Sequence, residues 1–215
     1  MRLNVYGDII VDEYKRIYDH YGWNACCPAD VRKAVESLED GETLEVKINS
    51  GGGMVSAGQE IYTTLRRYDN VEIEVEGLAA SAASLIAMAG KSKISPVGVL
   101  MIHDVSCSGC GGNKNDLHKM ADALHTYDDA LAQAYALKTG HSKDAILDLM
   151  DKETYMTAKD AVDLGFIDAI SDTDYTASLF GGLKITQDAI DKYNASMKLE
   201  EEKNAILDDI DNFGV

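Results

Sequence analysis

The sequence predicts an α/β fold with a mainly parallel sheet, and three observations lead to this prediction. Residues 44–48 and 71–76 alternate apolar and polar side chains, which is the period of a half-buried strand. Each of these strands leads into a segment of helical character, over residues 55–67 and 78–89. Strands that alternate with helices along a chain favour parallel pairing through crossover connections.

The other elements follow in chain order. A short strand is expected over residues 3–9, whereas the polar and aromatic residues 10–27 are typical of a loop or lid. Pro28 suits the first turn of a helix that runs to Leu38, because proline already has the backbone angle needed there. The rest of the chain predicts one or two strands in 93–103, a loop over 104–114, helices over 116–137, 142–150 and 157–164, and a closing strand over 166–170.

Composition narrows the classes of function. The chain has 215 residues and a formal net charge of −17, so the phosphates of a nucleic acid would repel it. The N-terminus lacks the basic and apolar runs of a secretory signal, and the apolar helix at 78–89 is too short for a bilayer. We therefore expect a cytoplasmic protein without nucleic-acid or membrane partners.

A chain of this length can hold one domain and an extension. We place the domain at residues 1–170 and an acidic C-terminal extension at residues 171–215. Apolar residues recur among many charges over 186–210, which predicts an amphipathic helix. Such a helix is either a solvated chain end or a contact with another subunit, and the sequence leaves both interpretations open.

The four cysteines form two clusters. Cys26 and Cys27 are adjacent, and Cys107 and Cys110 have a spacing found in metal and redox sites. Because adjacent cysteines rarely bind one ion well, we expect free thiols or loop residues rather than a zinc site. A disulfide framework is not expected in a chain of this size in a reducing compartment.

Ser81 is a candidate nucleophile. It stands between the strand at 71–76 and the Ala-rich helix, near the first helical turn, where unpaired N–H groups gather. Those groups can stabilise the oxyanion that forms when a hydroxyl attacks a carbonyl. A capping or packing role would explain the same serine, so this stretch alone does not decide between them.

Other segments could complete a catalytic centre. Residues 51–53 are three glycines whose N–H groups could bind an oxyanion, although a plain turn would use the same residues. His103 ends an apolar strand, the position at which α/β folds place their sites, but it could also be a buried histidine. Asp151 and Glu153 are carboxylates that could orient the imidazole.

Four segments together resemble motifs of the Clp protease proteolytic subunit family, in the same order. Residues 48–53, Ile-Asn-Ser-Gly-Gly-Gly, and the following Ala57 and Gly58 are similar to its Ile-Asn-Ser-Pro-Gly-Gly and Ala-Gly stretch. Residues 77–81, Gly-Leu-Ala-Ala-Ser, are similar to its nucleophile segment. Two more segments match its histidine motif and the region after its acid, residues 101–103 and 155–168.

The resemblance implies a crotonase-like fold of stacked ββα units, with a C-terminal helical extension, and a serine endopeptidase that hydrolyses peptide bonds. Carried over, Ser81 is the nucleophile, His103 the general base and Glu153 the triad acid. The family uses aspartate as the acid, so glutamate is a departure, and Asp151 remains an alternative.

The resemblance also assigns the oxyanion and substrate contacts. Gly53 and Ala82 would donate their N–H groups to the oxyanion, with Gly52 and Met54 lining the substrate site. The substrate would lie extended beside residues 51–54 as an added strand. Gly51 stands where the family has proline, which loosens that turn. No metal and no other cofactor is implied.

The implied partners are a polypeptide substrate and further copies of the chain. Family members form hexameric or heptameric rings, often stacked, and the helix at 116–137 is where stacking is expected. The segment 10–27 and the tail after residue 171 resemble Clp-like peptidases encoded in bacteriophage head gene clusters, which are associated with prohead maturation. This resemblance implies capsid or scaffold proteins as partners. The alternative partner is an AAA+ unfoldase.

Two other hypotheses remain open at the sequence level. A crotonase-like acyl-CoA enzyme would use paired glycine N–H groups in the same way, but the chain offers no basic surface for the CoA phosphates. A catalytically inactive assembly or scaffold protein on the same fold would depend on the C-terminal tail.

Overall fold

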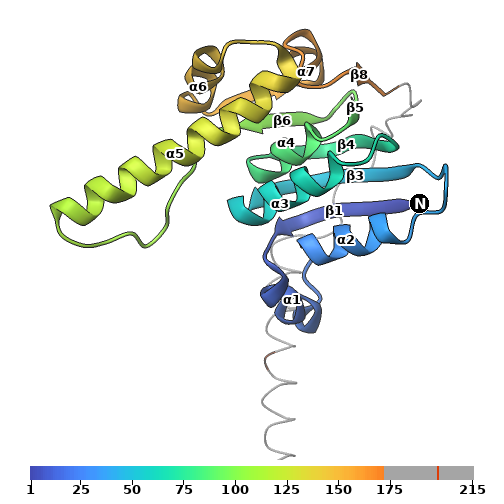
Figure 1. Cartoon of the computed structure of the whole chain (residues 1–215), viewed down its shortest axis with the longest axis horizontal. Helices are drawn as coiled ribbons and strands as arrows, with labels where there is room; N and C mark the ends of the chain where they lie inside the picture. Colours follow the sequence, from blue (N-terminus) through green and yellow to red (C-terminus); the bar gives the residue numbers. More distant parts are fainter. Residues whose placement is uncertain (172–197, 199–215) are drawn as a thin grey trace, which may run out of the picture. The chain divides into compact units, whose positions relative to one another are not determined.

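A computed structural model describes residues 1–171 and residue 198. Residues 1–171 lie within one compact unit, which is built on an eight-stranded sheet (Figure 1). Its main path runs β2-β1-β3-β4-β5-β8, and β6 joins β4 to β7. The strands are β1 (Arg2–Ile9), β2 (Ala25–Cys26), β3 (Leu44–Gly53), β4 (Val71–Ala80), β5 (Lys91–Ile94), β6 (Val99–Ile102), β7 (Thr154–Thr157) and β8 (Ala169–Ile170).

The strand pairs are parallel, except for the antiparallel pair of β6 and β7. This arrangement confirms the predicted α/β fold with a mainly parallel sheet. The helices are η1 (Asp12–Tyr14), α1 (Lys15–Tyr21), α2 (Pro28–Glu36), α3 (Val55–Leu65), α4 (Ala82–Ala87), α5 (Lys114–Thr139), α6 (Lys143–Asp151) and α7 (Ala158–Asp163). Pro28 occupies the first turn of α2, as predicted.

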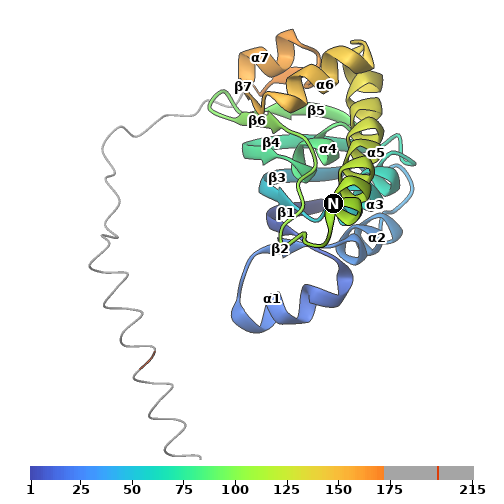
Figure 2. The same cartoon turned by 90° about the vertical axis from the view of Figure 1, so that its left-hand side faces the viewer.

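The core lies between the sheet and the helices that cover one of its faces. Figure 2 shows α2, α3 and α5 on the same side of the sheet. Alternate side chains of the central strands point toward these helices, and the intervening positions of β3, β4 and β5 carry charged residues. The largest fully buried side chains include Ile48, Ile61, Leu85, Ile86 and Phe166.

The boundary between β4 and α4 differs from the prediction. The strand continues through Gly77 to Ala80, and the helix begins only at Ala82. The reason is pairing at a distance: β5 pairs with the first half of β4, and β6 then pairs with residues 78–80. These strand contacts override the helix preference of the Ala-rich segment.

Two other predictions also need correction. Residues 10–27 are not only a loop, because they contain η1, α1 and the edge strand β2, whose pairing with β1 draws Cys26 and Cys27 into the core. The closing strand is shorter than expected and spans only Ala169–Ile170. The residues before it, Phe166 and Ile167, turn back on α7 with their N–H groups bonded to the Ala161 carbonyl.

The cysteines divide into a bonded and a free pair. Cys107 and Cys110 are loop residues between β6 and α5, one of the two alternatives that the sequence left open, and they pair as a disulfide rather than standing as free thiols. Cys26 and Cys27 are free and buried. Burial raises the pKa of Cys26 to about 12 and that of Cys27 to about 11, so both thiols are unreactive at neutral pH.

The predicted C-terminal extension and its amphipathic helix lie outside the described residues, apart from Ser171 and Lys198. Within the described residues, no helix has the length and apolar character needed to cross a membrane.

Candidate active site

Ser81 lies at a sharp turn between β4 and α4. It is the N-cap residue of α4, and its backbone angles, φ 55° and ψ −125°, fall where residues with a side chain are rarely found. A conformation of this kind costs on the order of 1–3 kcal/mol, so the surroundings must hold it. The half-buried Ser81 is followed by the fully buried helix α4, so the turn presents the hydroxyl at the border of the core.

The pairing of β4 with β6 brings His103 to Ser81. Ala80 lies opposite Met101, and the Ser81 N–H donates to the Met101 carbonyl at 3.0 Å. His103 follows two residues later, and its Nε2 lies 2.8 Å from Ser81 Oγ. This is the contact that a general base needs in order to take the proton of a nucleophilic hydroxyl.

The end of β3 passes very close to the Ser81 turn. A Cβ atom on Gly52 would lie 2.7 Å from both the Ala80 carbonyl oxygen and Ser81 Cβ. The φ of Gly52, +98°, also disfavours any residue with a side chain. Gly52 therefore allows the two backbones to approach, whereas a Cβ at Gly51 would meet nothing within 4 Å.

Gly53 and Ala82 are the predicted oxyanion donors, and the structure gives the surroundings of their N–H groups. Gly53 lies opposite Ile9 of β1, and the Ile9 carbonyl accepts from the Met54 N–H at 2.8 Å. In this parallel pattern Ile9 makes the ladder bonds, so Gly53 directs its own N–H away from β1, toward the edge of β3 on which Ser81 lies. Ala82 is the first residue of α4, where N–H groups have no acceptor within the helix.

Among the described residues, one edge of residues 51–54 is paired with β1. β1 pairs with Gly52 and Gly53 on one side and also binds the Met54 N–H. On the other side the last pair with β4 joins Ser50 to Ala79, so the register with β4 ends before Gly51, next to the Ser81 turn. The Met54 side chain is 38% exposed at the start of α3.

Neither candidate acid, Asp151 or Glu153, makes a hydrogen bond with His103, whose side-chain partner among the described residues is Ser81. The antiparallel register ends with the pair of Ile102 and Thr154, and His103 and Glu153 are the residues next to this last pair. Glu153 is exposed and has a φ of 48°. Asp151 is also exposed, at the end of α6, and the hydrogen bonds of the described residues do not choose between the two carboxylates.

A small cavity of about 60 Å³ adjoins the Ser81–His103 pair. Its lining combines the site residues with apolar side chains from α3, α4 and α5. These apolar residues are Val55, Leu85, Leu131 and Tyr135. A short apolar side chain of a bound polypeptide would suit this space.

Asp104 borders both this cavity and a larger acidic hollow of about 430 Å³. Burial raises the pKa of Asp104, and the nearby carboxylates of Asp128 and Asp151 raise it further. His103 and His125 act in the opposite direction. Asp104, which follows the candidate base His103, is therefore destabilised in its ionised form.

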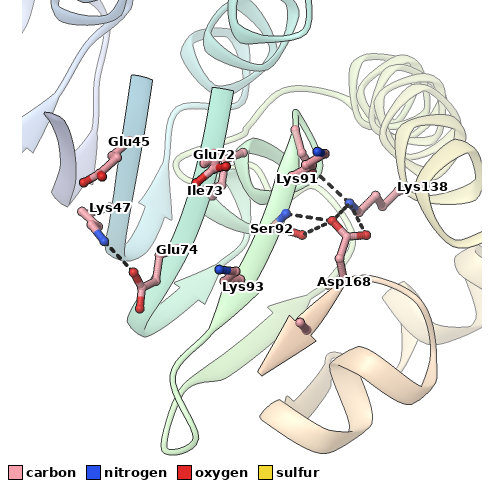
Figure 3. A pocket seen from close by; sticks show the side chains of 12 residues that line it. Glu45, Lys47, Glu72, Ile73, Glu74, Lys91, Ser92, Lys93, Lys138 and Asp168 are labelled. Carbon is pink, nitrogen blue, oxygen red and sulfur yellow. Dashed lines mark hydrogen bonds and ion pairs between the residues drawn. The ribbon is translucent and has the colours of Figure 1, made fainter. Parts of the chain in front are cut away.

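A third hollow, of about 760 Å³, lies elsewhere, on the charged face of the sheet (Figure 3). It shares no lining residue with the cavity beside Ser81. Figure 3 shows two ion pairs in it, Lys47 with Glu74 and Lys138 with Asp168. The described part of the chain contains no group of three or more His, Cys, Asp or Glu side chains that could hold a metal ion.

Three residues around the site escaped the sequence analysis. Ser84 and Tyr135 form a buried hydrogen bond behind Ser81, and Asp128 accepts a hydrogen bond from the Val105 N–H at 2.6 Å. Asp128 and Tyr135 are seven apart on α5 and share its buried face with Leu131. The sequence could have indicated them through one feature: an acid and a tyrosine that lie on the otherwise apolar face of a predicted helix.

Comparison with known proteins agrees with these motifs. The family model described as Clp protease matches residues 33–174 of the chain. The ATP-dependent Clp protease proteolytic subunit 2 of Tropheryma whipplei is 31% identical over 133 residues, which cover 60% of this chain and 73% of that protein. Subunit 1 of Chlamydia abortus is 31% identical over 141 residues, covering 63% and 73%. Subunit 2 of Thermobifida fusca is 34% identical over 139 residues, covering 62% and 68%.

With more than half of its length matched and relatives above 30% identity, this chain belongs to the Clp protease family.

Proposed function

We propose that this protein is a serine endopeptidase that cleaves polypeptides through Ser81, His103 and a carboxylate, with Glu153 as the acid. The observation that carries the proposal is the 2.8 Å contact between Ser81 Oγ and His103 Nε2 at a strained turn. The family membership and the names of the relatives support peptide hydrolysis as the reaction.

The proposed mechanism is acyl transfer. His103 Nε2 takes the proton of Ser81 as Oγ attacks the substrate carbonyl, and the N–H groups of Gly53 and Ala82 bind the oxyanion. The imidazolium then protonates the leaving amine, and a water molecule hydrolyses the acyl-enzyme with the same base. Glu153 would accept the second ring N–H of His103 and fix its tautomer.

The acid is tested by two matched variants. Glu153→Gln removes the charge of the proposed acid, whereas Asp151→Asn removes the charge of the other candidate. If Glu153 is the acid, Glu153→Gln lowers kcat on the order of 10⁴-fold, as loss of the triad acid does elsewhere, and Asp151→Asn changes it little. The reverse result would assign the acid to Asp151.

The nucleophile is tested by Ser81→Ala with a fluorophosphonate probe and a fluorogenic peptide. We expect both labelling and cleavage to be lost, because only residual catalysis survives when a triad member is removed. The control is Ser56→Ala, which removes an exposed hydroxyl from neighbouring α3. Unchanged labelling of Ser81→Ala would refute the assignment.

We further propose a cytoplasmic homo-oligomeric ring that acts in bacteriophage prohead maturation, with capsid or scaffold proteins as substrates. The resemblance of residues 10–27 and of the tail after residue 171 supports this role. Native mass spectrometry should give a hexamer or heptamer or twice that mass. Co-expression with a phage scaffold protein should give cleavage that Ser81→Ala abolishes, and cleavage only in the presence of an AAA+ unfoldase and ATP would favour general degradation instead.

A further inference from the structure

Behind Ser81, a buried hydrogen-bonded chain connects the nucleophile turn to α5. The Ser84 hydroxyl donates to the Ser81 carbonyl at 2.7 Å. Its oxygen also lies 2.8 Å from the hydroxyl of Tyr135. Ser84 has no exposed surface, and Tyr135 is only 2% exposed.

The direction of this chain follows from proton counting. A serine hydroxyl has one proton, and Ser84 gives it to the Ser81 carbonyl. Tyr135 must therefore be the donor in its bond to Ser84 Oγ. Burial raises the pKa of Tyr135 to about 12, so the phenol keeps that proton at neutral pH.

The Ser81 carbonyl is held from several sides. Besides the Ser84 hydroxyl, it accepts from the backbone N–H groups of Ser84 at 3.0 Å and of Leu85 at 3.3 Å. All three donors belong to the first turn of α4, and the contact that reaches a different element is the one between Ser84 Oγ and the Tyr135 hydroxyl of α5. Because Ser81 adopts a rarely populated conformation, a Ser84 hydroxyl that is held in place by Tyr135 restricts the Ser81 carbonyl and thereby the direction in which Oγ points.

We propose that Ser84 and Tyr135 are positioning residues that keep Ser81 Oγ within reach of His103 Nε2. The inference rests on the proposed function of Ser81 as nucleophile. Neither hydroxyl touches the reacting atoms; they act through the Ser81 carbonyl. Tyr135 also lines the cavity beside Ser81, so its ring couples the substrate side of the site to the same support.

Three single variants and one double variant test the proposal in the full-length protein. Tyr135→Phe removes the terminal hydroxyl and keeps the ring, and Ser84→Ala removes the link itself. The control is Ser95→Ala, because Ser95 Oγ is buried without a hydrogen-bond partner among the described residues. The second-order rate of fluorophosphonate labelling and the kcat and KM for a fluorogenic peptide are measured together with the melting temperature.

We expect Tyr135→Phe and Ser84→Ala to lower the labelling rate and kcat by roughly 10-fold, with KM little changed, because small displacements of a nucleophile are costly. The double variant should be no slower than Ser84→Ala, since Tyr135 acts through Ser84. Ser95→Ala should match the wild type. Wild-type rates in folded Tyr135→Phe and Ser84→Ala proteins would overturn the proposal.

A structural measurement separates this inference from the proposed function. In crystals of Ser84→Ala and Tyr135→Phe, we expect the distance from Ser81 Oγ to His103 Nε2 to exceed 3.5 Å, the ordinary hydrogen-bond limit. An unchanged distance in both variants would overturn the positioning role. If the wild-type protein fails to react with the probe, the peptidase proposal fails, and the distance still decides whether the two hydroxyls position Ser81.

Discussion

Gly52 is a residue whose replacement the Ser81 turn cannot accommodate without a shift. A Cβ at this position would collide with the Ala80 carbonyl and with Ser81, and the positive φ adds strain. We expect Gly52→Ala to lower the free energy of unfolding by about 1–3 kcal/mol and to abolish labelling of Ser81. Urea unfolding and probe labelling measure the two effects.

The neighbouring Gly51→Ala is the matched control for this prediction. A Cβ there would meet nothing within 4 Å, and Gly51 does not have a positive φ. We expect near wild-type stability and labelling. Equal damage from both substitutions would show that chain flexibility, rather than close approach at Gly52, limits this segment.

Asp104 is the second single residue whose replacement we expect to change the stability of the protein. Burial and the carboxylates of Asp128 and Asp151 raise its pKa in the folded protein, against the smaller opposite effects of His103 and His125. A carboxyl pKa that is raised by folding stabilises the fold at a pH below the pKa of the unfolded state. This contribution is lost as the pH rises through the pKa of the folded state. The ionised form is therefore unfavourable in the folded state at pH 7.

Asp104→Asn should accordingly raise the melting temperature at pH 7 by a few degrees at most, roughly the effect of 1 kcal/mol or less in a domain of this size. The difference should shrink toward pH 3, where the aspartate is protonated in both states. Asp40→Asn, an exposed carboxylate in a turn, is the control. A lower melting temperature for Asp104→Asn at pH 7 would contradict the expected sign.

At the scale of the element, α5 does two different things along its length. Its second half packs on the core through Leu131, Ala132 and Tyr135, and Asp128 fixes the start of the loop that follows His103. Its first half carries exposed apolar side chains, with Leu117 at 49%, Met120 at 40% and Tyr127 at 45% exposure. Figure 1 shows this half extending beyond the sheet.

The spacing of these exposed residues predicts a helix-to-helix contact. Leu117, Met120 and Tyr127 are exposed and Leu124 between them is half-buried; the four follow each other at intervals of three, four and three residues, the spacing of a coiled-coil seam. If stacked rings form through α5, the double variant Leu117→Lys and Met120→Lys should halve the mass of the assembly. Native mass spectrometry checks this, and Thr126→Lys on the opposite side of the helix should leave the mass unchanged.

At the scale of the whole described unit, Asp168 connects three elements. Its carboxylate accepts from the Ser92 N–H of β5 at 2.7 Å and from Lys138 of α5 at 2.7 Å, as Figure 3 shows. Asp168 itself lies just before β8. Burial alone would raise the pKa of Asp168, but Lys138 and the Ser92 N–H outweigh it, so the pKa lies below its usual range.

A carboxyl pKa that is lowered by folding stabilises the fold at a pH above the pKa of the unfolded state. This contribution is lost as the pH falls through the pKa of the folded state. Because 51% of the Asp168 side chain is exposed, solvent screening limits its effect to about 1 kcal/mol. Asp168→Asn should lower the melting temperature at pH 7 by about 2–4 °C and converge with the wild type in acid. Asp163→Asn, an exposed partner of Lys159, should change little; a constant difference at all pH values would contradict the charge-based explanation.

Local pattern in the amino-acid sequence was enough to predict several elements. Alternation marked β3 and the first half of β4, and the helical period marked α3 and α5. The four family motifs also stand in the linear chain, so membership of the Clp protease family and the candidate residues Ser81 and His103 were accessible from it. These features need only neighbours in sequence.

Three features follow from long-range contacts instead: the end of β4, the groups that contact Ser81, and the hydrogen bonds behind Ser81. β6 extends β4 to Ala80 and delivers His103, and Tyr135 reaches Ser84 from 51 residues away. Such contacts connect groups that are distant in the chain, and a hydrogen bond between them leaves no periodic trace in the sequence. The 2.8 Å contact between Ser81 and His103 is therefore a property of strand register, which local preference cannot encode.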